Sequence, residues 1–187
     1  MKFLHYVLAL TLLAAAPISV LAGPAKLRKG DSAGIFYVTK IAGPSDDGVT
    51  NGSELCYRCR YGASPMVLVF TRSQKPLVHK LAKEIDKAVK SNPNSKLKGM
   101  VTFIGEDVAE VKDMAAEFAK QVEAKHIPVV IAKETSSGPI NYKLDDSDVT
   151  VVIVKDSQVI VSHKFDDEKL DVTLIMNDVK QMLSGGV

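Results

Sequence analysis

The feature that most constrains the fold is a repeated switch between unbroken apolar runs and apolar residues spaced one helical turn apart. Residues 66–70 (MVLVF) are continuously apolar, which is typical of a strand covered on both faces. Residues 77–89 then place leucine, valine, isoleucine and alanine at helical spacing. A second, mostly apolar segment at 97–104 and a second helical stripe at 108–122 repeat the pattern. The sequence therefore predicts strand, helix, strand, helix, with both strands buried.

Capping residues support the starts of both helices. Ser73 can cap the first helix, with Pro76 in its first turn, where the missing N–H of proline costs nothing. Asp107 followed by Glu110 has the spacing of a capping box. We therefore expect the second helix to begin just after Asp107.

Shorter segments flank this centre. Residues 35–41 and 127–132 have the length and composition of strands. Residues 45–64 are polar and contain an Asn-Gly turn signal, so we expect a loop there, and another loop at 133–148. These segments predict an N-terminal strand and loop extension before the first central strand.

The last third of the chain predicts a hairpin and a closing helix. Residues 149–154 and 159–163 are apolar runs separated by a turn at Asp156 and Ser157. Apolar residues at helical spacing from 170 to 182 then indicate a final helix. The complete order predicts an α/β fold whose mixed β-sheet has helices on both faces.

The N-terminus has the pattern of an export signal. Lys2 is followed by an apolar run and by small residues before Gly23, so we expect residues 1–22 to be a removed signal peptide. Residues 23–34, which are polar and basic, are expected to be a solvated leader or linker. The folded domain is then residues 35–187, exported to the periplasm or the extracellular space.

Charge and hydropathy exclude several classes of partner. Without Lys2 the formal charge falls from +2 to +1, which gives no electrostatic reason to expect binding to nucleic acid or to an anionic membrane. The apolar run near the N-terminus is shorter than the ~20 residues of a transmembrane helix, and no second one follows. We expect no stable membrane anchor, and the sequence leaves the oligomeric state open.

The only two cysteines, Cys56 and Cys59, form a C-x-x-C motif inside the polar loop. In an oxidising compartment such a pair closes into a disulfide that either holds a loop or exchanges with other thiols. Arg58 and Arg60 would favour a thiolate electrostatically. Tyr57 and Tyr61 could form a recognition surface, although packing of the loop onto the sheet is their commoner role.

Metal and cofactor binding are less favoured interpretations of the pair. A tetrahedral site would need two more ligands besides the thiolates, and each of His79, His126 and His163 has a simpler explanation, His79 on a polar helix face. Covalent haem requires histidine where Arg60 stands. We therefore expect no cofactor and no metal.

The order of elements resembles the thioredoxin superfamily, and in particular its peroxiredoxin and exported TlpA-type branch with an N-terminal hairpin extension. The similarity is clearest in residues 65–88 and in residues 150–161 (TVVIVKDSQVIV). It implies a thioredoxin-like sheet. In that superfamily the active-site cysteine follows the first central strand and opens the first helix, where the helix N-terminus lowers the thiol pKa.

This sequence departs from the family pattern at both catalytic positions. Residues 71–76 (TRSQKP) stand at the active-site position and contain no cysteine, so we expect that segment to be chemically inert. The cis-proline of the family would fall near Asp148 and Val149 and is also missing. Pro128 is expected only to begin a strand.

Two functions remain open from the sequence. One is an exported thiol-disulfide oxidoreductase in which Cys56 and Cys59 are a relocated redox pair acting on protein thiols and disulfides. The other is a non-catalytic thioredoxin-like envelope or binding protein whose disulfide is structural. An exposed bridge favours the first function, and a buried, reductant-resistant bridge favours the second.

Overall fold

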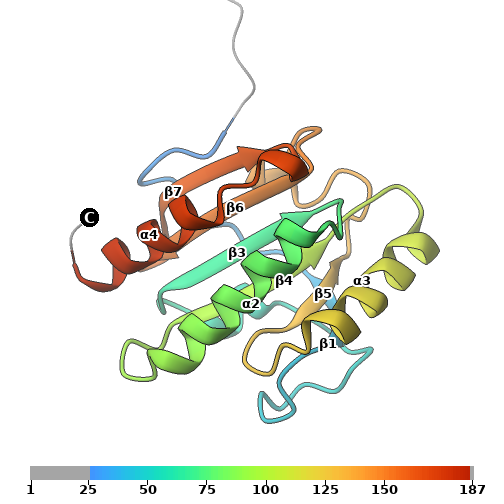
Figure 1. Cartoon of the computed structure of the whole chain (residues 1–187), viewed down its shortest axis with the longest axis horizontal. Helices are drawn as coiled ribbons and strands as arrows, with labels where there is room; N and C mark the ends of the chain where they lie inside the picture. The colour runs from blue at the N-terminus through green and yellow to red at the C-terminus, as the bar shows by residue number, and fades with distance from the viewer. Residues whose placement is uncertain (1–25, 186–187) are drawn as a thin grey trace, which may run out of the picture.

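A computed structural model describes residues 26–185 and has a seven-stranded mixed sheet at its centre (Figure 1). The strands lie in the order β2-β1-β5-β4-β3-β6-β7. Their bounds are β1 Val38–Ala42, β2 Glu54–Leu55, β3 Met66–Thr71, β4 Lys98–Phe103, β5 Val129–Ala132, β6 Val149–Lys155 and β7 Gln158–Phe165. The α-helices are α1 Tyr57–Tyr61, α2 Pro76–Ser91, α3 Val108–Val122 and α4 Val172–Leu183, with short 3-10 turns at Ile140–Tyr142 and Asp167–Lys169.

The centre of the sheet follows the predicted strand-helix-strand pattern. Strand β3 pairs in parallel with β4 and antiparallel with β6, so Val69 lies opposite both Val101 and Val151. All three valines are at most 1% exposed. The prediction that these strands are central and buried is confirmed, because unbroken apolar runs leave no polar face to turn toward water.

The predicted closing hairpin is also present. Strands β6 and β7 pair antiparallel across the two-residue turn Asp156 and Ser157. Both turn residues have positive φ, 51° and 66°, as a tight hairpin turn with the twist of its strands requires. Asp107 caps α3 as predicted, since its carboxylate accepts hydrogen bonds from the N–H groups of Ala109 and Glu110.

Helices lie on both faces of the sheet, but unequally. The three long helices α2, α3 and α4 pack on one face (Figure 1), in a core that includes Leu81, Phe118 and Ile175. The chain steps from β3 to β4 to β5 in one direction, so right-handed crossovers place α2 and α3 on the same side. The opposite face carries the short α1, through Tyr57, together with the segment before β1.

Several element boundaries differ from the sequence-based prediction. Strand β1 begins at Val38 rather than at residue 35, where Ile35 is exposed. The segment predicted as a loop at 45–64 contains β2 and α1. The cap of α2 is Lys75 rather than Ser73, although the Ser73 hydroxyl accepts a hydrogen bond from the Lys75 N–H at 3.2 Å. Such short elements depend on tertiary partners that a sequence pattern does not show.

The segment before β1, expected as a solvated leader, packs on the domain from about residue 27 onward. Leu27 and Ala33 are 5% and 2% exposed. The N–H groups of Gly30 and Ala33 donate to the carbonyl oxygens of Val159 and Ser157 at 2.9 Å. The reason is that β7 is an edge strand, whose unpaired backbone groups attract another extended segment.

The predicted signal peptide, residues 1–22, lies outside the described residues. Within residues 26–185, no helix combines the length and the apolar character that crossing a membrane would require.

Candidate functional site

The C-x-x-C motif forms the start of a helix. Cys56 is the N-cap of α1, and its Sγ accepts a hydrogen bond from the N–H of Cys59 at 3.0 Å. Gly62, with φ of 59°, ends the helix in a conformation that favours glycine. A helical turn brings residues three positions apart onto one side. The local sequence therefore places the two sulfurs next to each other.

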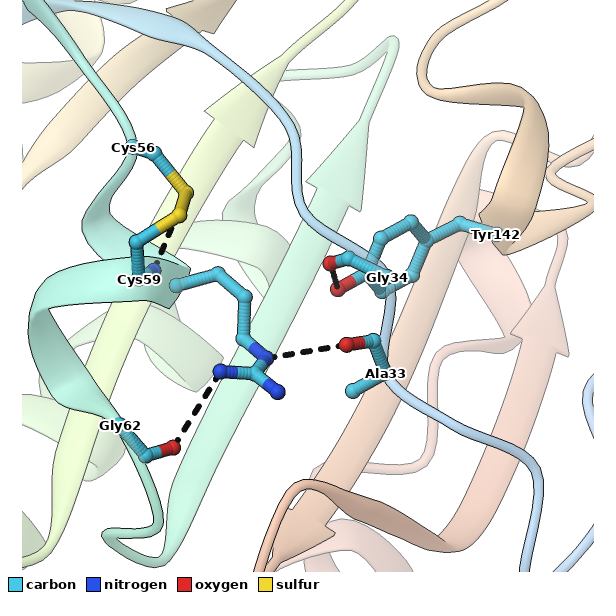
Figure 2. Close-up of a disulfide and its surroundings, with 7 residues drawn as sticks. Ala33, Gly34, Cys56, Cys59, Gly62 and Tyr142 are labelled. Carbon is cyan, nitrogen blue, oxygen red and sulfur yellow. Dashed lines mark hydrogen bonds between the residues drawn. A yellow bond between two sulfur atoms is a disulfide. The ribbon is translucent and has the colours of Figure 1, made fainter.

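Cys56 and Cys59 form an intramolecular disulfide, as predicted (Figure 2). Their sulfurs are 2.07 Å apart and their Cα atoms 5.2 Å apart, within the range that a disulfide can bridge. In the described part of the chain no cysteine is free. The structure thus holds this pair in its oxidised form.

The two halves of the bridge differ in their exposure to solvent. Cys56 is only 8% exposed, and the next two residues, Tyr57 and Arg58, are buried as well. Cys59 and Arg60 are exposed. A reactant in solution therefore meets the disulfide from the Cys59 side.

The two arginines that were expected to favour a thiolate bind backbone oxygens instead. The Nε of Arg58 donates to the Ala33 carbonyl at 3.0 Å, and its Nη1 to the Gly62 carbonyl at 3.3 Å. Arg60 donates to the Asp47 carbonyl at 2.8 Å. A guanidinium group that is buried must keep its N–H groups paired, and these carbonyls provide that pairing. Arg58 thus ties α1 to the segment before β1.

Lys40 in β1 and Asp47 in the loop that follows it support α1, and the sequence analysis missed both. Lys40 lies in β1 and is 1% exposed. Its Nζ donates to Asp47 Oδ1 at 2.8 Å and to the carbonyls of Pro44 and Val49 at 2.6 and 2.9 Å. The second oxygen of Asp47 accepts the Tyr57 hydroxyl at 2.6 Å. A lysine in a predicted strand normally faces water, so no local signal marked it as buried.

The protonation states of Asp47 and Tyr57 are fixed around neutral pH. Burial raises the pKa of Asp47, but hydrogen bonds from Lys40, Tyr57 and Val49 outweigh it, and the pKa lies below its usual value. Burial, followed by the Asp47 hydrogen bond, raises the pKa of the Tyr57 phenol. The carboxylate therefore stays ionised and the phenol stays a donor.

The tyrosines beside the cysteines pack α1 against the sheet. Tyr57 is 1% exposed and shares the core of this face with Met66 and Leu68. The Tyr61 hydroxyl donates to the Gly99 carbonyl at the start of β4 at 3.1 Å, and the two tyrosine rings lie 5.6 Å apart. Packing is thus the main role of both rings, and Tyr61 places the carboxyl end of α1 beside the start of β4.

The usual active-site position of thioredoxin-like proteins directly follows β3 and is occupied by backbone-supporting contacts. The Thr71 hydroxyl accepts the Ser73 N–H at 3.0 Å and donates to the Ser73 carbonyl at 2.8 Å. The Arg72 guanidinium donates to the carbonyls of Ser136 and Asp145. These contacts shape the start of α2, and no thiol is among them.

The histidines are dispersed. His79 stacks on Phe118 at 4.6 Å, between α2 and α3, rather than lying on a polar helix face as expected. His163 Nε2 pairs with Asp178 at 2.7 Å, and the backbone N–H of His126 donates to the Asp86 carboxylate. The described residues contain no group of three or more histidine, cysteine or acidic side chains that could hold a metal ion.

Comparison with solved structures shows that the fold is thioredoxin-like. A candidate thiol:disulfide interchange protein DsbE from Chlorobium tepidum superposes with a TM-score of 0.62 at 15% identity, over 84% of this chain and 99% of that one. AhpC from Mycobacterium bovis gives 0.62 at 12% identity, over 87% and 96%. A candidate protein disulfide isomerase from Bacteroides thetaiotaomicron gives 0.57 at 15% identity, over 84% and 91%.

These likenesses concern the fold alone, because the sequence identities are low. No protein-family model matches the chain, and no curated protein matches it. The chemistry of this protein therefore depends on the residues of its site rather than on its fold.

Proposed function

We propose that this protein is an exported thiol-disulfide oxidoreductase whose redox pair is Cys56 and Cys59. The observation that carries the proposal is the exposure of Cys59 within a closed disulfide. Thiol-disulfide exchange needs a sulfur that an incoming thiolate can reach. Exposed disulfides are the exchangeable ones, whereas a purely structural bridge is usually shielded.

Protein thiols and disulfides are the proposed substrates. Two structures with the same fold carry names that refer to disulfide exchange, which supports this class of substrate without assigning it. The helix α1 presents Cys59 and Arg60 together to solvent, so a flexible segment of another protein could approach the bridge without displacing the core.

Export is part of the proposal because the chemistry depends on the compartment. The signal-like residues 1–22 would direct the chain to an oxidising space, where a disulfide persists. Fractionation of the native host, followed by N-terminal sequencing, should find the protein outside the cytoplasm and beginning at Gly23. A cytoplasmic protein that still begins at Met1 would contradict this part.

A structural role for the disulfide is the alternative, and one observation favours it. Cys56 caps α1, and Tyr57 and Tyr61 fasten that helix to the sheet. In that case the bridge would hold α1 in place and take no part in exchange.

Insulin reduction and refolding of a scrambled disulfide protein distinguish the two functions. The parent should accelerate both reactions, and Cys56→Ser and Cys59→Ser should return them to the uncatalysed rate. Equal rates in parent and variants would leave only the structural role. Free-thiol titration of the purified protein, which should find no reactive thiol before reduction, confirms that the assays begin from the closed bridge.

A further inference from the structure

The disulfide is asymmetric in two independent ways, and both have the same chemical consequence. The first is access. Cys56 is 8% exposed and is followed by buried Tyr57 and Arg58, whereas Cys59 is exposed. A thiolate must reach the sulfur that it attacks, and which sulfur it reaches sets the rate of exchange. Attack on the sulfur of Cys59 is therefore favoured.

The second asymmetry is the hydrogen bonding of the two sulfurs. The Cys59 N–H donates to Cys56 Sγ at 3.0 Å. Across residues 26–185 we find no corresponding donor to the sulfur of Cys59. A hydrogen bond that is donated to a sulfur stabilises the thiolate that forms on it when the bridge opens. Cys56 is thus the better leaving group.

The surroundings of Cys56 hold this arrangement in place. Tyr57 is bound through its hydroxyl to Asp47, and Arg58 is bound to the Ala33 and Gly62 carbonyls. These contacts fix the two residues that follow Cys56 in the chain. They do not involve either sulfur, so they remain available when the bridge opens.

We propose that Cys59, the second cysteine of the motif, is the one that forms the mixed disulfide with substrate, and that Cys56 is the leaving and resolving thiol. This inference rests on the proposed oxidoreductase function and assigns the roles within it. The co-reactant is a protein dithiol when the bridge acts as oxidant.

The electron balance of this order is simple. A substrate thiolate attacks Cys59 Sγ, a substrate-Cys59 disulfide forms, and the electron pair of the broken bond leaves on Cys56 as a thiolate. The second substrate thiolate then attacks the substrate sulfur, which releases Cys59 as a thiolate. The substrate dithiol is oxidised by two electrons and the protein disulfide is reduced. In the opposite direction Cys59 attacks a substrate disulfide, and Cys56 attacks Cys59 to release the reduced substrate.

The first experiment uses the unaltered protein. The oxidised parent is mixed with glutathione and quenched within the first seconds by N-ethylmaleimide in acid. Trypsin digestion then separates the two cysteines, because trypsin cuts after Arg58. Mass spectrometry should find glutathione on Cys59 and the maleimide on Cys56 in at least ~10-fold excess over the reverse product, because the sulfur of the exposed residue is attacked and the hydrogen-bonded one leaves. A reverse or equal distribution would overturn the assignment.

The second experiment separates access from ionisation. The variants Cys56→Ser and Cys59→Ser are treated with glutathione disulfide at a pH high enough to ionise either thiol. Folded Cys56→Ser, which retains Cys59, should react at least ~10-fold faster than folded Cys59→Ser, and the two rates should converge in concentrated guanidinium, where burial no longer differs. Equal rates in the folded proteins, or no reaction of Cys59 until the protein unfolds, would contradict the proposal.

Failure of this inference differs from failure of the proposed function. A parent that catalyses insulin reduction but carries its adduct on Cys56 retains the function and loses the assignment of roles. A parent that forms the adduct on Cys59 without accelerating insulin reduction retains the assignment of roles and loses the proposed function.

Discussion

Removing the carboxylate of Asp47 should destabilise the folded protein by about 3 kcal/mol, because it leaves a buried ammonium without its counter-charge. Lys40 is 1% exposed, and its Nζ lies 2.8 Å from Asp47 Oδ1. Removal of one partner of a buried ion pair costs ~3–5 kcal/mol. We use the lower end because the Asp47 side chain is 17% exposed and Lys40 retains two carbonyl partners. The Tyr57 hydroxyl also loses its acceptor.

Urea unfolding of Asp47→Ala at neutral pH, followed by circular dichroism, measures this loss. Lys40→Met is the matched variant, since it keeps a long side chain and removes the charge. The double variant Lys40→Met with Asp47→Ala should lose less stability than the sum of the single variants, because no charge is then stranded.

Acid sensitivity provides a second readout of the same pair. The pKa of Asp47 lies below its usual 3.8 in the folded protein. The stabilisation is therefore fully present above that value and is lost as the pH falls through the folded-state pKa.

A loss below about 1 kcal/mol in Asp47→Ala, or strictly additive single and double variants, would refute the reasoning, since a buried pair must be coupled.

Three further predictions concern other parts of the fold. Burial lowers the pKa of His79 from 6.5 in the folded protein. The unfolded chain therefore binds the proton first, and stability is lost as the pH falls below about 6.5. His79→Phe should remove this pH dependence from urea midpoints measured at several pH values, and an unchanged pH dependence would contradict the prediction. Gly43 has φ of 126°, and an added Cβ would lie 2.6 Å from Pro128 Cα, so Gly43→Ala should cost more than the ~1–2 kcal/mol of a positive φ alone. Gly52→Ala, which has positive φ but open space around it, is its control, and equal losses would refute the steric argument. Ser73→Ala should lower the free energy of unfolding by ~1 kcal/mol in the same urea assay, because the hydrogen bond from the Lys75 N–H is lost. It should leave insulin reduction unchanged. Reduced turnover at normal stability would place chemistry at the start of α2.

The sequence was sufficient for the architecture wherever a periodic pattern was long enough to be unambiguous. The apolar run of β3, the stripe of α3 and the hairpin turn at Asp156 and Ser157 each correspond to the structure. In these segments the local preference and the tertiary burial agree, so the pattern alone predicts the element. The absence of cysteine from residues 71–76 was equally visible in the sequence.

The sequence could not predict α1. A five-residue helix has too few internal hydrogen bonds to be stable by itself. It exists here because Tyr57 packs beneath it, Tyr61 binds the Gly99 carbonyl, and the disulfide closes its first turn. The polar composition of the segment favours a loop locally, and the loop prediction was wrong here because tertiary contacts overrode that preference.

The sequence by itself determined that two cysteines three residues apart could close a disulfide. It also determined the buried strands of the sheet. The tertiary structure decided that Cys56 is buried and that Cys59 faces solvent. It also decided that Arg58, which lies between the two cysteines in sequence, binds the Ala33 carbonyl 25 residues away. Spacing sets which atoms can meet along the chain, but exposure and charge pairing depend on segments that come together only when the sheet forms.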